Sequence, residues 1–432
     1  MTNHCTQKTS PSPGESMYAL TEKLFPICRS LTGEGVRQTL RELQRMVPEL
    51  ELHEVPTGTQ VMDWVIPREW NIRDAWIKDA AGKKIIDFQQ SNLHVVGYSL
   101  PLHKKVSLDE LKKMVYTLPE QPELIPYVTS YYKERSGFCM SDKQLNSLPE
   151  GEYELFIDSS LHEGSLTYAD IVLPGETEQE IMFTTYVCHP SMANNELSGP
   201  VLAIHLAQYL KNRKRRYTYR FVFAPETIGA VTYLSRHMHH LQKHLKAGFV
   251  LTCVGDSGDF SYVESRYANT YADRVAQNIL STELPHFNRY SFLERGSDER
   301  QYCAPGVDLP VCSVMRSKYA KYPEYHTSAD DLSLVSPESY QKTWDIYLKM
   351  LQLIEADGYY KIKTLGEPQL GKRGLYPQTG TKNSSRVVRS MMNFIAYLDG
   401  SNDLIDISNR IGVSAAELIG YLDKLKDAHL VE

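Results

Sequence analysis

The chain has 432 residues, of which 42% are hydrophobic and 23% are charged, an ordinary globular composition with room for two or three domains. Lys and Arg number 47 against 53 Asp and Glu, so the net charge of −6 gives no electrostatic basis for nucleic-acid binding. No apolar run approaches the ~20 residues of a membrane span, and the amino-terminal residues contain no apolar signal core. We therefore expect a cytoplasmic protein that binds neither nucleic acid nor membranes.

The first third of the chain is expected to contain two helices and then a β-rich insert. Residues 1–15 are polar and contain two prolines and a glycine, which predicts a disordered lead-in. Residues 16–51 carry two amphipathic helical patterns, each ended by a proline. Between 52 and 160, short β-like runs alternate with turn residues, as is typical of a small β-rich domain.

From residue 161 to 375 the pattern alternates between strands and helices. Four nearly continuous apolar runs are typical of strands buried on both faces of a sheet: 180–187, 219–225, 248–255 and 309–316. Four helical patterns lie between and after them: 199–212, 229–244, 271–281 and 337–356. The sequence thus predicts one α/β domain, formed by 16–51 and 161–375, with a mixed, mostly parallel sheet between two helical layers.

Residues 376–432 are expected to form a winged helix-turn-helix domain. Helices are predicted at 386–398, 402–410 and 414–426, with a turn at Gly412, Ser414 as an N-cap and a short apolar strand at the end. This segment has six Lys and Arg against seven Asp and Glu, whereas a DNA-binding surface needs a basic face. We therefore expect it to contact a protein partner or a second copy of the chain.

Polar side chains cluster after the first buried strand. His189 follows that strand directly, and the same loop carries Asn194, Asn195 and Glu196 before the next helix begins. In open α/β sheets, ligands bind at the carboxyl ends of the strands. A His and a carboxylate from one loop can bind zinc if a third ligand comes from elsewhere, although a loop that caps itself with polar side chains gives the same pattern.

Three further segments place chemically useful groups beside the later strands. Glu226 follows the second strand, where it can act as a general base or simply stabilise a helix N-terminus. Asp298 and Arg300 precede the fourth strand, and His326 lies in a loop after it. Asp330, four residues beyond His326, can orient that imidazole, and each of these segments can also be an ordinary surface loop.

Three tryptophans lie in or beside the β-rich insert. Trp64, Trp70 and Trp76 can form either the core of a small β domain or a platform on which sugars stack. We favour the core interpretation.

Several long segments resemble a bacterial family of zinc aminopeptidase-like proteins that is often found with polysaccharide biosynthesis genes. The matching segments, which span most of residues 16–375, include LFPICRSLTGEGVRQTL, EVPTGTQVMDWVIPREWNI, CHPSMANNELSGP, PETIG, GSDERQYCAPGVDLP and YPEYHTS. The resemblance implies a three-layer zinc-aminopeptidase fold with a β-rich insertion and a C-terminal winged helix. It also implies a hydrolase that cleaves a peptide or amide bond.

The resemblance implies which residues bind metal. This sequence departs from the two-zinc pattern at several of those positions. Two-zinc aminopeptidases use a His, a bridging Asp, a Glu, a second Asp and a final His; here the two histidines match His189 and His326. The bridging Asp falls among Asn194, Asn195 and Glu196, the Glu-Glu pair becomes Glu226-Thr227, and the second Asp becomes Cys253. Because carboxylates are missing, we expect one zinc ion, bound by His189, Glu196, His326 and a water.

The remaining roles follow from that arrangement. Glu226 is expected to take the proton from the water, and Arg300 or Arg316 to bind a substrate carboxylate. We also expect Asp298 and Tyr325 to contact substrate, and Asp330 and Asn195 to support the ligands without binding metal. A small aminoacyl or acylamino compound is the expected substrate. The alternatives are Asn195 in place of Glu196 as ligand, two zinc ions, and a catalytically altered relative that only binds a ligand or a protein partner.

Overall fold

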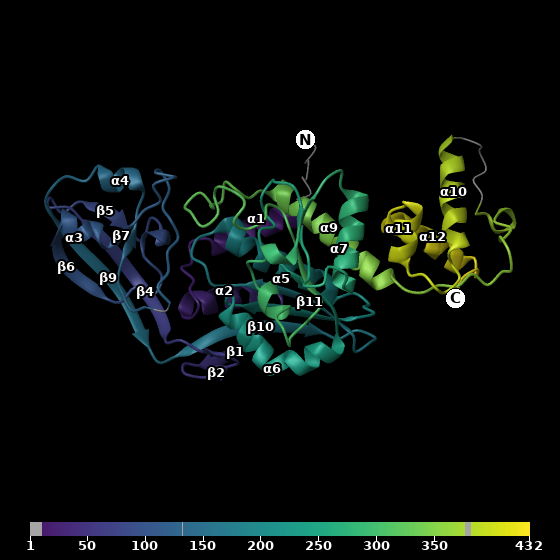
Figure 1. The fold of residues 1–432 in the computed structure, drawn as a ribbon, viewed down its shortest axis with the longest axis horizontal. Helices are drawn as coiled ribbons and strands as arrows, with labels where there is room; N and C mark the ends of the chain where they lie inside the picture. The colour runs from purple at the N-terminus through teal and green to yellow at the C-terminus, as the bar shows by residue number, and fades with distance from the viewer. Residues whose placement is uncertain (1–10, 132, 376–381) are drawn as a thin grey trace, which may run out of the picture.

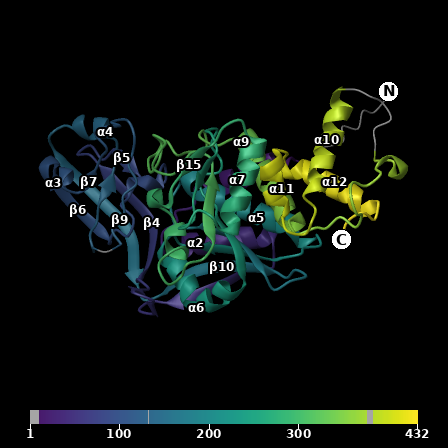
Figure 2. The same cartoon turned by 45° about the vertical axis from the view of Figure 1, so that its right-hand side comes forward.

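The structure is a computed structural model that describes residues 11–131, 133–375 and 382–432. The first ten residues of the expected lead-in, and residues 376–381 of the expected C-terminal domain, lie outside the described residues. Three parts follow one another along the long axis of the molecule: the β-rich insert in blue, the central α/β domain and the yellow helical domain at the C-terminus (Figures 1 and 2). Among the described residues, no helix combines the length and the apolar surface needed to cross a membrane.

The central domain is built on an eight-stranded mixed sheet with the order β1-β10-β12-β11-β13-β16-β14-β15. Its strands are β1 (Glu51–Pro56), β10 (Ser165–Leu173), β11 (Glu180–Tyr186), β12 (Thr218–Ala224), β13 (Leu245–Val250), β14 (Ser261–Val263), β15 (Asn288–Tyr290) and β16 (Val311–Met315). The four strands predicted from apolar runs are β11, β12, β13 and β16, and they form the parallel centre of the sheet. Their carboxyl ends therefore lie on one edge.

Helices cover both faces of this sheet. One layer contains α1 (Pro13–Leu24), α2 (Glu34–Met46), α5 (Ser198–Lys211), α7 (Tyr271–Glu283) and α9 (Pro337–Ala356). The other layer contains α6 (Ile228–His244) and the short α8 (Glu299–Tyr302). The predicted three-layer α/β architecture is confirmed.

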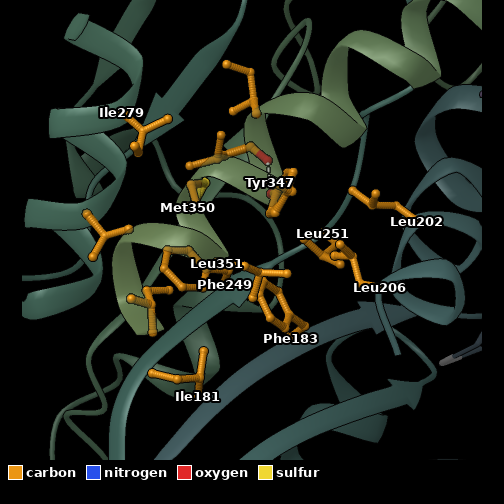
Figure 3. Close-up of a cluster of buried hydrophobic side chains, with 14 of the residues drawn as sticks. Ile181, Phe183, Leu202, Leu206, Phe249, Leu251, Ile279, Tyr347, Met350 and Leu351 are labelled. Carbon is orange, nitrogen blue, oxygen red and sulfur yellow. Dashed lines mark hydrogen bonds between the residues drawn. The ribbon is translucent and has the colours of Figure 1, made fainter. Parts of the chain in front are cut away.

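The larger core lies between the sheet and the helices α5, α7 and α9 (Figure 3). Phe183 of β11 stacks on Phe249 of β13 with ring centroids 5.6 Å apart, and Tyr347 of α9 approaches Phe183 from above. The Tyr347 hydroxyl donates to the Val314 carbonyl at 2.6 Å, so this buried phenol leaves no donor unpaired. Full burial of one such side chain contributes about 1.5–3 kcal/mol to stability. The packed sheet therefore holds the loops at its edge in fixed positions.

The insert is a four-stranded antiparallel sheet with the order β5-β4-β9-β6 and its own small core. Its strands are β4 (Glu69–Lys78), β5 (Lys84–Asp87), β6 (Leu102–Ser107) and β9 (Glu152–His162). Smaller elements accompany it: β7 (Val115–Tyr116), β8 (Phe138–Cys139), α3 (Leu108–Lys112) and α4 (Asp142–Asn146). The hairpin of β2 (Gln60–Val61) and β3 (Trp64–Val65) packs instead against α6 of the central domain.

Two expected boundaries differ from the structure. The lead-in was expected to extend to residue 15, but α1 begins at Pro13 because Ser12 and Glu15 form a capping box and proline suits the first helical turn. The insert was expected to begin at residue 52, but that position lies within β1, which pairs with β10 in the large sheet. The chain therefore leaves the central domain after β1 and returns along β10.

The C-terminal domain contains α10 (Lys382–Ala396), α11 (Leu404–Ile411) and α12 (Ala415–Asp427). Gly412, with φ 66°, ends α11, and the Ser414 side chain caps α12 as predicted. In place of the expected final strand, Val431 forms an isolated antiparallel bridge with Ile362. Beside this bridge, Lys361 N–H donates to the Glu432 carbonyl at 3.0 Å, and Lys363 N–H donates to the Leu430 carbonyl at 2.8 Å. This long-range pairing connects the two ends of the winged helix.

Candidate active site

A cavity of about 610 Å³ lies where the insert meets the carboxyl ends of β11 and β12. The central domain supplies Cys188, His189, Glu226, Arg300 and His326 to its wall, and the segments in or beside the insert supply Trp64, Pro67, Tyr127, Thr129 and Tyr131. The strand-end residues expected to act together therefore meet. The contribution of the insert was not predicted.

His189 is held in one orientation by Glu196. Its Nδ1 lies 2.8 Å from Glu196 Oε2, and because a carboxylate only accepts, Nδ1 carries the proton. The Cys188 N–H donates to the other Glu196 oxygen at 2.6 Å. The opposite ring nitrogen, Nε2, lies 3.7 Å from Glu226 Oε2. Both residues line the cavity.

Buried Arg29 contacts both His189 and Glu196. Its Nε donates to the His189 carbonyl at 2.9 Å and lies 3.5 Å from Glu196 Oε1. The charge of Glu196 is thus compensated by a guanidinium, and each of its oxygens already has a donor. Glu196, expected to bind zinc directly, instead lies behind His189.

Glu226 follows β12 at a sharp turn. Its N–H donates to Cys188 Sγ at 3.3 Å, and Thr227, the next residue, has φ 64°. Burial raises the pKa of the Glu226 carboxyl, while His189 and Arg300 oppose the shift. A carboxyl with a raised pKa, beside an imidazole, is suited to proton transfer near neutral pH.

His326 is positioned by the insert. Tyr127 N–H donates to the His326 carbonyl at 2.9 Å, and Pro126 forms an antiparallel bridge with Thr327. The Tyr127 ring lies 5.1 Å from both His189 and His326, whose own ring centroids are 5.3 Å apart. Burial, and then the neighbouring His189, lowers the pKa of His326 to about 3, so this imidazole is neutral.

The backbone is strained at several positions around the site. Ser191, Thr227, Cys253 and His326 all have positive φ, from 20° to 64°. Such conformations cost of order 1–3 kcal/mol each in a non-glycine residue and concentrate at functional sites. Glu196 itself lies in a single π-helical turn, Ala193–Leu197, another irregularity common at such sites.

Asn195 offers a free oxygen at this turn. Its Nδ2 donates to the Tyr186 hydroxyl at 2.9 Å. Because Thr252 Oγ1 donates to the Asn195 carbonyl, Tyr186 donates to Thr252 and can only accept from Asn195, which fixes the amide orientation. Asn195 Oδ1 is buried and accepts no hydrogen bond from the described residues.

Two of the expected residues make other contacts in the structure. Asp330 does not orient His326: it accepts the N–H groups of Asn194 at 2.6 Å and Asn195 at 3.0 Å, and burial raises its pKa to about 6. Arg316 does not reach the cavity, since its guanidinium packs 4.3 Å from the Phe260 ring. Asp330 thus shapes the Asn194–Asn195 turn instead.

The other candidate substrate contacts differ in their positions. Arg300 lines the cavity and donates to the Thr227 hydroxyl. Asp298 is buried beneath it and accepts the Thr227 N–H at 2.7 Å, so it supports the Glu226 turn. Tyr325 stacks on His326 at 3.8 Å between ring centroids and orients that ring.

The donor atoms fit a single zinc ion better than two. One group of potential ligand atoms, from Cys188, His189 and Glu196, lies within 4.8 Å, but within this group the His189 Nδ1–H already donates to Glu196. A histidine whose Nδ1–H is held by a carboxylate presents Nε2 as a metal ligand. His189 Nε2 and neutral His326 lie on the cavity wall, and Asn195, which is not among the lining residues, has an unpartnered oxygen. These atoms are the candidate ligands of one ion, whereas two ions need more carboxylates than the described residues of this wall supply.

The fold and the site together define an aminopeptidase-like α/β protein with a C-terminal winged helix. A family profile described as Domain of unknown function (DUF4910) matches residues 18–357, and a winged helix-turn-helix profile matches residues 357–432. A relative from Clostridium acetobutylicum is 43% identical over 432 residues, covering 100% of this chain and 99% of its own. Its name describes a candidate polysaccharide biosynthesis protein with an aminopeptidase-like domain. The chain belongs to this DUF4910 family.

Solved structures agree with that assignment. A crystal structure of a candidate peptidase from C. acetobutylicum matches with a TM-score of 0.91 and 42% identity, covering 97% of this chain and 96% of that chain. A zinc aminopeptidase from Bacillus subtilis matches with a TM-score of 0.58 and 11% identity, covering 80% and 96%, and so shares the fold. The family and fold expected from the sequence are confirmed.

Proposed function

We propose that the protein is a zinc-dependent hydrolase that cleaves a peptide or amide bond in a small aminoacyl or acylamino substrate. The observation that carries this proposal is the approach of Glu226 Oε2 to His189 Nε2, at 3.7 Å, on a cavity wall shared with His326. A partly buried carboxylate on the same cavity wall as two imidazoles provides both a base and metal ligands. The aminopeptidase-like fold supports the same class of reaction.

His189, His326 and Asn195 would hold one zinc ion, and Glu196 would orient His189. When bound, zinc polarises the substrate carbonyl and lowers the pKa of a bound water. This set replaces the expected ligand Glu196 with the alternative Asn195, because the oxygens of Glu196 already accept from Cys188 and His189. A neutral amide oxygen is a weaker ligand than a carboxylate, so we expect a modest zinc affinity.

Glu226 takes a proton from the attacking water and delivers it to the departing amine. The raised pKa favours this transfer, because burial makes it easier for the Glu226 carboxylate to accept the proton from water. The Thr227 N–H bond to Asp298 keeps the turn that carries Glu226 in place. This hydrogen bond therefore keeps the Glu226 carboxyl in position for proton transfer.

Arg300 determines which substrates fit. It is the only Lys or Arg among the described residues that line the cavity, and Glu226 is the only carboxylate. We therefore expect a substrate carboxylate to bind Arg300, and we expect poor binding of a free amino terminus, which lacks a dedicated acidic partner. The C. acetobutylicum relative is named for polysaccharide biosynthesis, and within that process we propose an acylamino compound as the substrate.

Metal analysis and an activity panel test this proposal. Protein purified without chelator should contain about one zinc per chain, and a panel of N-acylated and free aminoacyl amides should reveal turnover. Glu226→Gln should keep the zinc and lose 10²–10⁴-fold in kcat, roughly the contribution of a general base. Glu120→Gln, an exposed change outside the site, is the control. Full activity in Glu226→Gln would refute its role.

A second candidate function is ligand binding without catalysis. It is favoured by the neutral residues Asn195, Thr227 and Cys253 at positions where the resemblance implies acidic ligands. Metal-free protein with no turnover on the panel would support it.

We further propose a cytoplasmic location for the protein. For the winged helix we propose contact with a protein partner or a second copy of the chain, because its net charge is negative.

A further inference from the structure

A second cavity, of about 580 Å³, lies between the connection from α1 to α2 and the insert. It is separate from the catalytic cavity, since the two have no lining residue in common among those described. Its wall joins Gln38 of the central domain to Asn71, Gln90 and Asn92 of the insert. A hollow at the junction of two domains is a common place for a small-molecule site.

The wall of this second cavity is rich in neutral hydrogen-bonding groups and aromatic rings. Five of its side chains are amides, and three are aromatic: Phe25, Trp70 and Phe88. Glu34 is the only charged side chain among the lining residues, and Arg41 already pairs with it at 2.5 Å. The cavity therefore has no cation on its described wall to bind a phosphate or a carboxylate.

Asn92 gives an independent sign of a missing partner. The residue is only 7% exposed, and its Nδ2 makes one long bond, 3.5 Å, to the Pro26 carbonyl. Its Oδ1 is buried and accepts no hydrogen bond from the described residues. An unpaired buried acceptor costs roughly 1–3 kcal/mol, which a bound donor would recover.

We propose that this second cavity binds an uncharged saccharide ring. Sugar hydroxyls both donate and accept, so they match amide side chains, which also do both. The apolar face of the ring matches Phe25 and Phe88, which line the cavity and are partly exposed. The absence of a lining cation favours a neutral sugar over a phosphorylated one.

The position of this cavity connects it to the catalytic site through a single segment. Cys28, Ser30 and Thr32 line the second cavity, whereas Leu31 lines the catalytic one. Arg29, between them, turns inward to the His189 carbonyl. A sugar in the second cavity would thus contact the segment that holds His189, without entering the substrate site.

Ligand-observed NMR on the full chain tests the proposal. Saturation-transfer spectra with glucose and N-acetylglucosamine should show binding, and glucose 6-phosphate should bind at least several-fold more weakly. Gln38→Ala and Gln90→Ala change exposed side chains on the wall and should each weaken the binding several-fold. Gln179→Ala, exposed on the central domain, is the matched control. Asn92→Leu, which removes the unpaired acceptor, should abolish the signal.

Three results would overturn the proposal. The first is the absence of a signal from both neutral sugars. The second is binding that survives both glutamine variants, because the sugar would then lie outside the second cavity. The third is binding that is lost in Arg300→Ala, because the sugar would then lie in the catalytic cavity. None of these results depends on turnover, so the NMR experiment tests sugar binding independently of the hydrolase proposal.

Discussion

Glu196 Oε2 lies 2.8 Å from His189 Nδ1, and this contact decides which nitrogen of His189 faces the cavity. The carboxylate is fully buried and is neutralised by Arg29 at 3.5 Å. A buried pair of this kind orients a metal-binding imidazole and increases its basicity. Glu196 is therefore proposed as a positioning residue for His189.

Glu196→Gln should lower zinc affinity without abolishing it. An amide keeps the shape but loses the charge that polarises His189, and loss of such a supporting partner typically costs about 10–100-fold in affinity. Competition with a chromogenic chelator measures the change, and circular dichroism checks the fold. Complete loss of zinc from a folded variant would instead mean that Glu196 binds the ion directly.

Asn195→Asp should have the opposite effect. A carboxylate at this position would add a charge where a neutral oxygen now lies unpaired, so zinc affinity should rise at least tenfold. Asn195→Ala should lower it by a similar factor. The same chelator competition measures both variants. Equal zinc affinity in wild type, Asn195→Asp and Asn195→Ala would exclude Asn195 as a ligand.

The strand ends of the central sheet were predictable from sequence, but the directions of several side chains were not. His189, Glu226 and His326 were expected together because apolar runs identified the parallel strands whose ends meet. Glu196 was expected to bind zinc and Arg316 was one of two arginines expected to bind a substrate carboxylate, but sequence spacing does not tell which side of a loop a side chain occupies. Glu196 turns toward Arg29, and Arg316 turns toward Phe260.

The contribution of the insert was missed for a different reason. Tyr127 binds the His326 loop through main-chain contacts between segments far apart in the chain. No local pattern encodes such a contact.

Arg300→Met should raise KM for substrates with a carboxylate and leave kcat nearly unchanged. Loss of a charged hydrogen-bonded contact costs about 1.5–3 kcal/mol, or roughly 10- to 150-fold in KM. Neutral amide substrates should be affected much less. Steady-state kinetics on matched acid and amide substrates measures this selectivity. Arg295→Met, an exposed change nearby, should leave both values as in wild type.

Ser328→Ala should loosen the contact between the insert and the His326 loop. Ser328 Oγ accepts the Ile125 N–H at 3.0 Å, next to the bridge that holds His326. Loss of this bond should cost about 1 kcal/mol of stability and lower zinc affinity several-fold. Ser333→Ala, on an exposed turn of the same loop, is the control. Unchanged zinc affinity in Ser328→Ala would indicate that His326 does not depend on the insert.

Glu69→Gln should destabilise the junction between the insert and the central domain in a pH-dependent way. The Arg37 guanidinium donates to both Glu69 oxygens, at 2.8 and 2.6 Å, and the Ser165 N–H donates at 3.1 Å. The hydrogen bonds from Arg37 contribute most to lowering the pKa of Glu69 from 4.5 to about 2. The stabilisation is therefore complete above about pH 4.5 and is lost as the pH falls toward 2.

Urea unfolding across a pH series measures the effect of this substitution. At neutral pH the variant should lose about 1.5–3 kcal/mol of unfolding free energy, because one charged partner of Arg37 is gone. Between pH 4.5 and 2 the two proteins should converge, since protonated Glu69 is as neutral as glutamine. Glu51→Gln, exposed on β1, should follow the wild type throughout. A difference that stays constant with pH would mean that the Glu69 charge does not stabilise the junction.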